Sequence, residues 1–183
     1  DWIIKMTENF QKVKIAVLGD LMLDDYIIGK VERISTEAPV PVVNVEEEKF
    51  VLGGAANVVN NLSKLGAEVY CLGVIGTGHN SRRLLSAFDE EIHVEGIIRS
   101  EERPTIVKKR VLSGNHQLLR LDWEDSSPIS KDLEEEVLKR FFNISDKIDA
   151  IILSDYNKGV LTKRGSREII RICREKNIVV TVD

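Results

Sequence analysis

Two carboxylates follow the first apolar segment of the chain, in the run Gly19-Asp20-Leu21-Met22-Leu23-Asp24. The residues before them, Lys14 to Gly19, form a β-branched apolar run that ends in glycine, which is typical of a buried strand. A carboxylate at a strand end can accept hydrogen bonds from two sugar hydroxyls at once. It can equally cap the backbone amides of its own loop. The residues alone do not separate these two interpretations.

A glycine-rich segment, Gly53-Gly54-Ala55-Ala56-Asn57, opens a predicted helix. Small residues let a ligand approach the backbone closely, and the start of a helix offers free amide groups. Asn57, one turn into the helix, can both donate a hydrogen bond to a hydroxyl and accept one from it. Tight packing of the helix on a sheet would need the same glycines. The segment is not a Walker loop, because no Gly-Lys-Ser/Thr follows it.

The third candidate segment is Ser154-Asp155-Tyr156-Asn157-Lys158-Gly159, at the end of another predicted strand. Lys158 could meet a phosphate as a mobile point charge. Asp155 could hold a hydroxyl or help to place a metal. An ordinary turn with a solvated lysine would have the same sequence pattern.

Basic residues gather in a predicted hairpin, at Lys108, Lys109, Arg110 and Arg120. Because side chains alternate along a strand, Lys108 and Arg110 should share one face. Such a cluster could bind the phosphate of a phosphorylated substrate. A solvent-exposed face of the hairpin would show the same basic residues. The three histidines form no ligand spacing, so we assign no metal site.

The rest of the pattern alternates short apolar runs with amphipathic stretches. It predicts helices that begin after serine N-caps at Ser81 and Ser130. The predicted core strands are Lys14–Gly19, Glu68–Ile75, Val94–Ile98, Ala150–Ser154 and Val179–Val182, and the predicted helices begin at Gly53-Gly54 and span Ser81–Phe88, Ser130–Phe142 and Thr162–Lys176.

This order predicts an α/β fold with a doubly wound, mainly parallel sheet. Ligands of such sheets bind at the carboxyl ends of strands, and the residues there are Gly19-Asp20, Ile75-Gly76 and Ser154-Asp155. Weaker strands at Tyr26–Val31 and Val40–Glu47, separated by a proline-containing turn, belong at an edge or outside the main sheet. With the hairpin Thr105–Leu112 and Gln117–Trp123 they suit a small β flap, in segments of about 26–48 and 105–123. Residues 1–13 form an N-terminal extension.

The composition bounds the class of protein. The 183 residues are 43% hydrophobic and 31% charged, with a net charge of −4. An acidic chain is a poor candidate for a nucleic-acid binder or for a protein of anionic membrane surfaces. Two cysteines without metal spacing indicate reduced thiols, and no signal peptide or membrane span is evident. We therefore expect a cytoplasmic protein.

Taken together, the segments resemble the ribokinase-like carbohydrate kinases. Within them the chain is most similar to heptose-7-phosphate kinases, the kinase domain of the bifunctional ADP-heptose synthesis proteins. The resemblance runs from about Lys14 to Asp183. It rests on the three segments above, on a flap strand pair and on a proline-rich turn: Gly19–Asp24, Arg33–Val42, Gly53–Val58, Arg110–Ser113, Gln117–Asp122 and Ser154–Gly159.

The resemblance implies a three-layer αβα fold and ATP-dependent phosphorylation of the anomeric hydroxyl of D-glycero-D-manno-heptose 7-phosphate, with Mg²⁺, in ADP-heptose and lipopolysaccharide core synthesis. It implies a homodimer through the flap. Lys158 and Asp155 would face the ATP phosphates and the reacting groups. The implied sugar ligands are Asp20, Asp24, Gly53, Gly54, Asn57 and Asp155, and the candidates for the 7-phosphate are Arg33, Arg110 and Arg120.

Two departures from the family pattern matter. The loop Gly76-Thr77-Gly78-His79-Asn80 lacks an aspartate that related kinases carry. The family also continues with further strands and a Gly-Ala-Gly-Asp segment that supplies an anion hole and the catalytic base. We therefore expect this chain to be the N-terminal portion of the domain, with no catalytic residue of its own and no turnover alone.

Three alternatives remain at this level. The chain could be a non-catalytic sugar-binding or dimerising module, or part of a kinase for another phosphosugar. A dehydrogenase is disfavoured because no Gly-x-Gly-x-x-Gly follows the first strand.

Overall fold

The computed structural model describes residues 13–183, so the predicted N-terminal extension lies outside the described part except for Val13. Two separate sheets organise these residues. The main sheet contains β1 (Lys14–Gly19), β4 (Glu68–Ile75), β5 (His93–Arg99), β8 (Ala150–Ser154) and β9 (Val179–Val182). The helices are α2 (Ala55–Lys64), α3 (His79–Ser86), α4 (Lys131–Ile144) and α5 (Lys163–Lys176).

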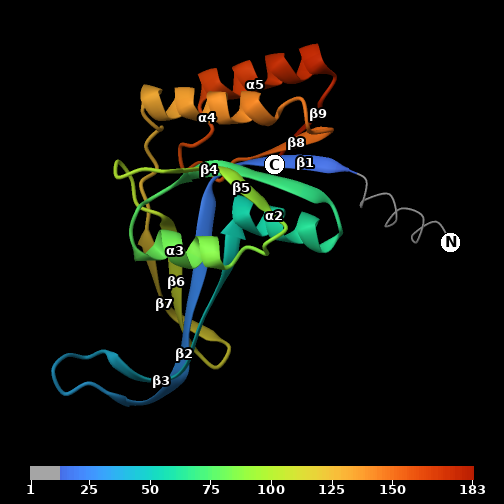
Figure 1. The fold of residues 1–183 in the computed structure, drawn as a ribbon. Helices are drawn as coiled ribbons and strands as arrows, with labels where there is room; N and C mark the ends of the chain where they lie inside the picture. Colours follow the sequence, from blue (N-terminus) through green and yellow to red (C-terminus); the bar gives the residue numbers. More distant parts are fainter. Residues whose placement is uncertain (1–12) are drawn as a thin grey trace.

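The main sheet is parallel throughout, with the strand order β5-β4-β1-β8-β9. Helices α4 and α5 cover one face and α2 and α3 cover the other, which gives three layers (Figure 1). Alternation along β1 explains this arrangement, because Ala16 and Leu18 join one apolar cluster while Ile15 and Val17 join the other. The predicted α/β fold with a parallel sheet is confirmed.

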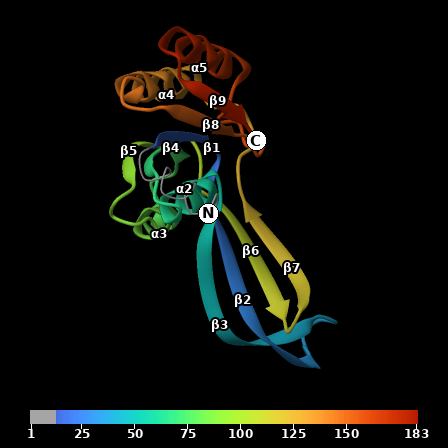
Figure 2. The ribbon, with the colours of Figure 1, turned by 90° about the vertical axis from the view of Figure 1, so that its right-hand side faces the viewer.

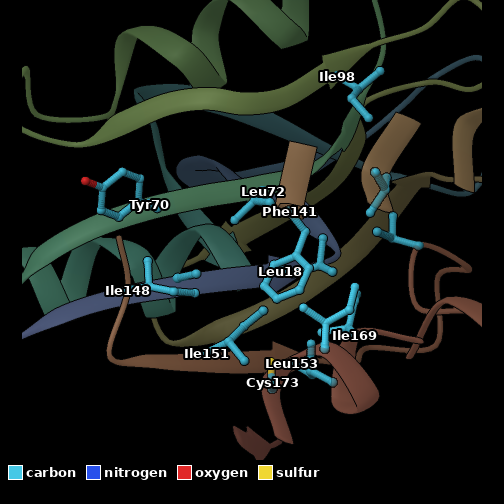
Figure 3. Close-up of a cluster of buried hydrophobic side chains, with 14 of the residues drawn as sticks. Leu18, Tyr70, Leu72, Ile98, Phe141, Ile148, Ile151, Leu153, Ile169 and Cys173 are labelled. Atoms are coloured by element: carbon cyan, nitrogen blue, oxygen red, sulfur yellow. The ribbon is translucent and has the colours of Figure 1, made fainter. Parts of the chain in front are cut away.

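The cluster beneath α4 and α5 is the larger of the two. Phe141 of α4 lies next to Leu18 of β1 at its centre, and neither side chain is exposed (Figure 3). Ile169 and Cys173 bring α5 into the same cluster. Burying these side chains supplies most of the free energy that holds the helices on the sheet.

The second sheet, here called the flap, has four strands in the order β3-β2-β6-β7. It contains β2 (Leu21–Ile34), β3 (Pro41–Gly54), β6 (Ile106–Ser113) and β7 (His116–Trp123). The flap extends away from the three-layer body (Figure 2). The proline-flanked strands therefore lie outside the main sheet, as predicted, but β2 and β3 are longer than predicted. β2 begins at the body, and β3 ends there.

The sequence predicted serine N-caps for two helices, α3 and α4. Ser130 caps α4 by accepting a hydrogen bond from the Leu133 amide, as predicted. The prediction for Ser81 was wrong, because α3 begins two residues earlier with Gly78 as its N-cap. The Ser81 hydroxyl instead donates to the Gly78 carbonyl at 2.7 Å.

Strand β9 lies at the edge of the main sheet, where Val179 and Val182 are each 65% exposed. None of the helices between residues 13 and 183 combines the length and apolar character needed to cross a bilayer.

Candidate active site

The main sheet changes winding direction between β1 and β8. From β1 the chain moves outward to β4 and β5, and then it returns to the other side of β1 to form β8. Crevices at such switch points bind the ligands of doubly wound sheets. Asp20 follows β1 and Asp155 follows β8, so two of the candidate segments lie side by side here.

Asp20 is fully buried at this point. Its carboxylate accepts hydrogen bonds from the backbone amides of Tyr156 (3.0 Å), Lys158 (3.0 Å) and Val160 (3.2 Å). Burial raises the pKa of Asp20, and these three amides partly oppose the rise. Its carbonyl also accepts from the Ala55 amide at 3.1 Å. Asp20 therefore organises the loop after β8 and the start of α2.

Asp24 lies on the flap, directly against the glycine segment. A Cβ atom at Gly53 would collide with the Asp24 carboxylate, and one at Gly54 would collide with the Asp20 carbonyl. Gly54 also has a φ of 54°, in the left-handed region that favours glycine. Gly53 thus makes room for the Asp24 carboxylate, and Gly54 makes room for the Asp20 backbone at the start of α2.

The N-terminus of α2 follows these glycines without a side-chain cap and without acidic residues in its first turn. Its first amides are therefore not satisfied by a capping side chain. Asn57, in that first turn, is exposed. This geometry leaves hydrogen-bonding groups available next to Asp24.

One face of the flap is lined with charged side chains. Arg110 donates to Asp24 at 2.5 Å, and its guanidinium lies 5.5 Å from the centre of the Tyr26 ring. In the register of the sheet Lys108 pairs with Asp24, so Lys108 and Arg110 share this face, as predicted. The Arg110 guanidinium is only partly exposed, which strengthens its attraction for an anion.

An ion-pair network joins this face to the loop after β8. Glu124 accepts from Lys158 at 2.8 Å and from Lys108 at 3.3 Å. The hydrogen bond from Lys158 lowers the pKa of Glu124, burial opposes it, and Lys108 lowers it further. Lys158 therefore points toward the flap and lies next to a second cation.

Other candidates lie further out. Arg120 is the cross-strand partner of Arg110 and donates to Asp122 at 2.9 Å. Asp155 is exposed, and it accepts from the Asn157 amide. Arg33 lies nine residues beyond Asp24 along β2, which is roughly 30 Å in an extended strand. The structure thus groups most of the candidates but leaves Arg33 near the far end of the flap.

The sequence patterns did not indicate two residues that take part in this region. Glu124 follows a predicted strand and belongs to no motif, and Arg103 lies outside every candidate segment. Arg103 is only 7% exposed and donates to three backbone carbonyls from distant segments. No local pattern could have revealed contacts that depend on which loops meet in the fold.

A model of the pfkB family of carbohydrate kinases matches residues 12–183 of this chain. The chain belongs to the pfkB family of carbohydrate kinases. It is 45% identical over 181 residues to the bifunctional protein HldE of Sulfurimonas denitrificans, covering 98% of this chain and 38% of that protein. HldE of Helicobacter pylori is 42% identical over 171 residues, covering 93% and 37%. This kinase-family chain therefore spans less than two fifths of these relatives.

Solved structures agree on the fold. A carbohydrate kinase from Agrobacterium tumefaciens superimposes with a TM-score of 0.65 at 19% identity, covering 93% of this chain and 53% of that one. Arabidopsis thaliana ribokinase, solved with ribose and ATP, gives 0.64 at 14% identity, covering 93% and 53%. The pfkB-family chain thus has a ribokinase-like fold over about half the length of these kinases.

Proposed function

We propose that this chain is the N-terminal part of a kinase that uses ATP to phosphorylate the anomeric hydroxyl of D-glycero-D-manno-heptose 7-phosphate, in ADP-heptose and lipopolysaccharide core synthesis in the cytoplasm. The observation that carries the proposal is the Asp24–Arg110 pair beside Gly53. It places a hydroxyl acceptor, a cation that could bind a phosphate and a residue without a side chain next to one another.

The sugar would lie between the flap and the start of α2. Asp24 and Asn57 would hold its hydroxyls, and Gly53 and Gly54 would let it approach the backbone. Arg110 would bind the 7-phosphate, with Arg120 beside it on the neighbouring strand. Asp20 would contribute through the loop it holds, and Asp155, which is exposed just after β8, would face the reacting groups.

ATP would supply the phosphoryl group, and its phosphates would draw Lys158 away from Glu124. Among residues 13–183 no three side chains of the metal-binding types gather to hold a cation. This suits Mg²⁺, which in kinases binds through one or two carboxylates and the substrate phosphates. Asp155, exposed at the strand end, has the chemistry to contribute one such ligand.

Binding of the sugar phosphate tests the site directly. Isothermal titration of the chain with heptose 7-phosphate should show binding that Asp24→Asn and Arg110→Gln each weaken at least about tenfold. The loss with Arg110→Gln should be much smaller for unphosphorylated heptose. Glu32→Gln, further out on β2, is the control. Equal losses for both sugars would argue against Arg110 as the phosphate ligand, and no loss in either variant would refute the site.

Turnover is proposed to require more than this chain. With ATP, Mg²⁺ and heptose 7-phosphate, the chain alone should release no ADP, because the family's base and anion hole come from a later Gly-Ala-Gly-Asp segment. Clear ADP release would contradict this. Addition of the corresponding remainder of a relative should restore turnover, whereas a non-catalytic module would stay inactive.

A homodimer through the flap is part of the proposal. Large apolar side chains are exposed on it, among them Phe50, Val51, Leu119, Leu121 and Trp123. Isolated apolar side chains are common on surfaces, but a run of them on one thin sheet favours an interface. Sedimentation should show a dimer that Leu119→Lys dissociates, with the body variant Leu65→Lys as control. A monomeric native chain would refute this part.

A further inference from the structure

Arg103 is a buried cation in the connection between β5 and β6, and the proposed function gives it no role. Its guanidinium donates to the carbonyls of Asp125 (2.5 Å), Lys158 (2.6 Å) and Ser127 (3.4 Å). Asp125 and Ser127 belong to the connection between β7 and α4, whereas Lys158 belongs to the loop after β8. One side chain therefore ties three separate connections together.

The peptide of Lys158 is held from both sides. Its amide donates to the buried Asp20 carboxylate at 3.0 Å, and its carbonyl accepts from Arg103. Hydrogen bonds to charged partners are the stronger kind, and both partners here are shielded from water. Asp20 and Arg103 thus bracket the backbone that carries the Lys158 side chain.

The residue after Lys158 reinforces this bracket. Gly159 has a φ of 84°, and a Cβ atom on it would collide with the Ser127 carbonyl. Its own carbonyl accepts from the Ile129 amide at 3.0 Å. The loop after β8 is therefore in backbone contact with the connection that leads out of the flap.

We propose that Arg103 is a positioning residue, which fixes the Lys158 loop opposite Asp20 and against the root of the flap. The inference rests on the proposed function in one respect, that Lys158 meets the phosphates of ATP. Arg103 acts through the Lys158 backbone, because its guanidinium is engaged by three backbone carbonyls. A planar guanidinium is needed because its donors diverge toward three carbonyls, and a lysine ammonium cannot reproduce that fork.

Hydrogen exchange on this chain tests the positioning without any activity. Arg103→Lys should speed exchange of the Lys158 and Val160 amides at least about tenfold, while the β8 amides keep their native rates. Arg99→Lys is the matched control, because Arg99 is exposed and donates a single bond to the Thr77 carbonyl. Unchanged loop exchange, or an equal acceleration throughout the sheet, would overturn the proposal.

A double-mutant cycle tests whether the effect passes through Lys158. The active enzyme for it is this chain joined after Asp183 to the corresponding remainder of Sulfurimonas denitrificans HldE. Arg103→Lys should raise KM for ATP about tenfold and leave KM for heptose 7-phosphate unchanged. In a Lys158→Ala background it should raise KM for ATP no further. Additive effects would show that Arg103 is merely structural.

The hydrogen-exchange experiment and the double-mutant cycle distinguish a failure of the positioning proposal from a failure of the proposed function. If Lys158→Ala alone leaves KM for ATP unchanged, the phosphate role in the proposed function is wrong, and the exchange rates alone decide the role of Arg103. If the joined enzyme is inactive, the exchange experiment still supports or overturns the positioning.

Discussion

In the main sheet, β1 buries five of its six residues, whereas all eight residues of β7 in the flap are exposed. The body strands are four to eight residues long and, except for the exposed edge strand β9, are covered by helices, while β2 and β3 run for fourteen residues each. Burial on both faces makes the body rigid, and the flap gains its order mainly from its root. The candidate site lies where the rigid sheet meets the flap, so fixed and adaptable groups can meet one ligand.

The largest expected effect comes from the body. Phe141→Ala should lower the free energy of unfolding by about 3–5 kcal/mol, because it empties a fully buried position in the larger cluster. Phe142→Ala next to it is the control. Phe142 is 57% exposed and its ring lies against the Lys176 ammonium, so the loss should be below about 1 kcal/mol. Similar losses in urea denaturation would contradict the contrast between buried and exposed residues.

The next effect concerns the contact between body and flap. Asp25 of β2 is buried and accepts two hydrogen bonds of 3.1 Å from Arg83 of α3, with Lys109 of β6 at 3.2 Å. Asp25→Asn should lower the free energy of unfolding by about 2 kcal/mol and speed hydrogen exchange in the flap more than in β1. Asp89→Asn, on the surface, should change neither. A loss shared equally by both sheets would contradict a separate flap.

The stabilisation that Asp25 gives through Arg83 and Lys109 should depend on pH. Burial raises the pKa of Asp25, but the hydrogen bonds and charges of Arg83 and Lys109 outweigh it, so the pKa lies below its usual value. Stabilisation by Asp25 is then complete above the unfolded-state pKa of about 4 and is lost as pH falls through the lower folded-state pKa. The difference in unfolding free energy between the native chain and Asp25→Asn should shrink in that range. A difference that is constant down to pH 2 would refute this.

The smallest effect is expected on the outer flap. Val45→Thr should change the free energy of unfolding by less than about 0.5 kcal/mol, because Val45 is half exposed on β3. Val17→Thr, the same substitution in the buried strand β1, should cost about 1–2 kcal/mol for an unpaired hydroxyl. If Val45→Thr destabilised the chain as much as Val17→Thr, Val45 would have to be buried in an assembly.

The sequence by itself determined the body. Strands β4, β8 and β9 coincide with their predicted ranges, because apolar β-branched runs between turn residues are a local property. It also placed the candidate groups at strand ends and paired Lys108 with Arg110 on one face, since alternation along a strand is local too. The cap of α3 was wrong because nothing local separates a capping serine from one in the first turn that bonds back to the chain.

Only the tertiary structure decided what those groups do. It turned the Asp20 carboxylate inward to three loop amides, set Arg33 far along the flap from Asp24, and gathered three carbonyls around Arg103. These contacts join segments that are tens of residues apart in the sequence. They exist because β8 returns beside β1, and a crossover between strands leaves no periodic trace in the residues that it brings together.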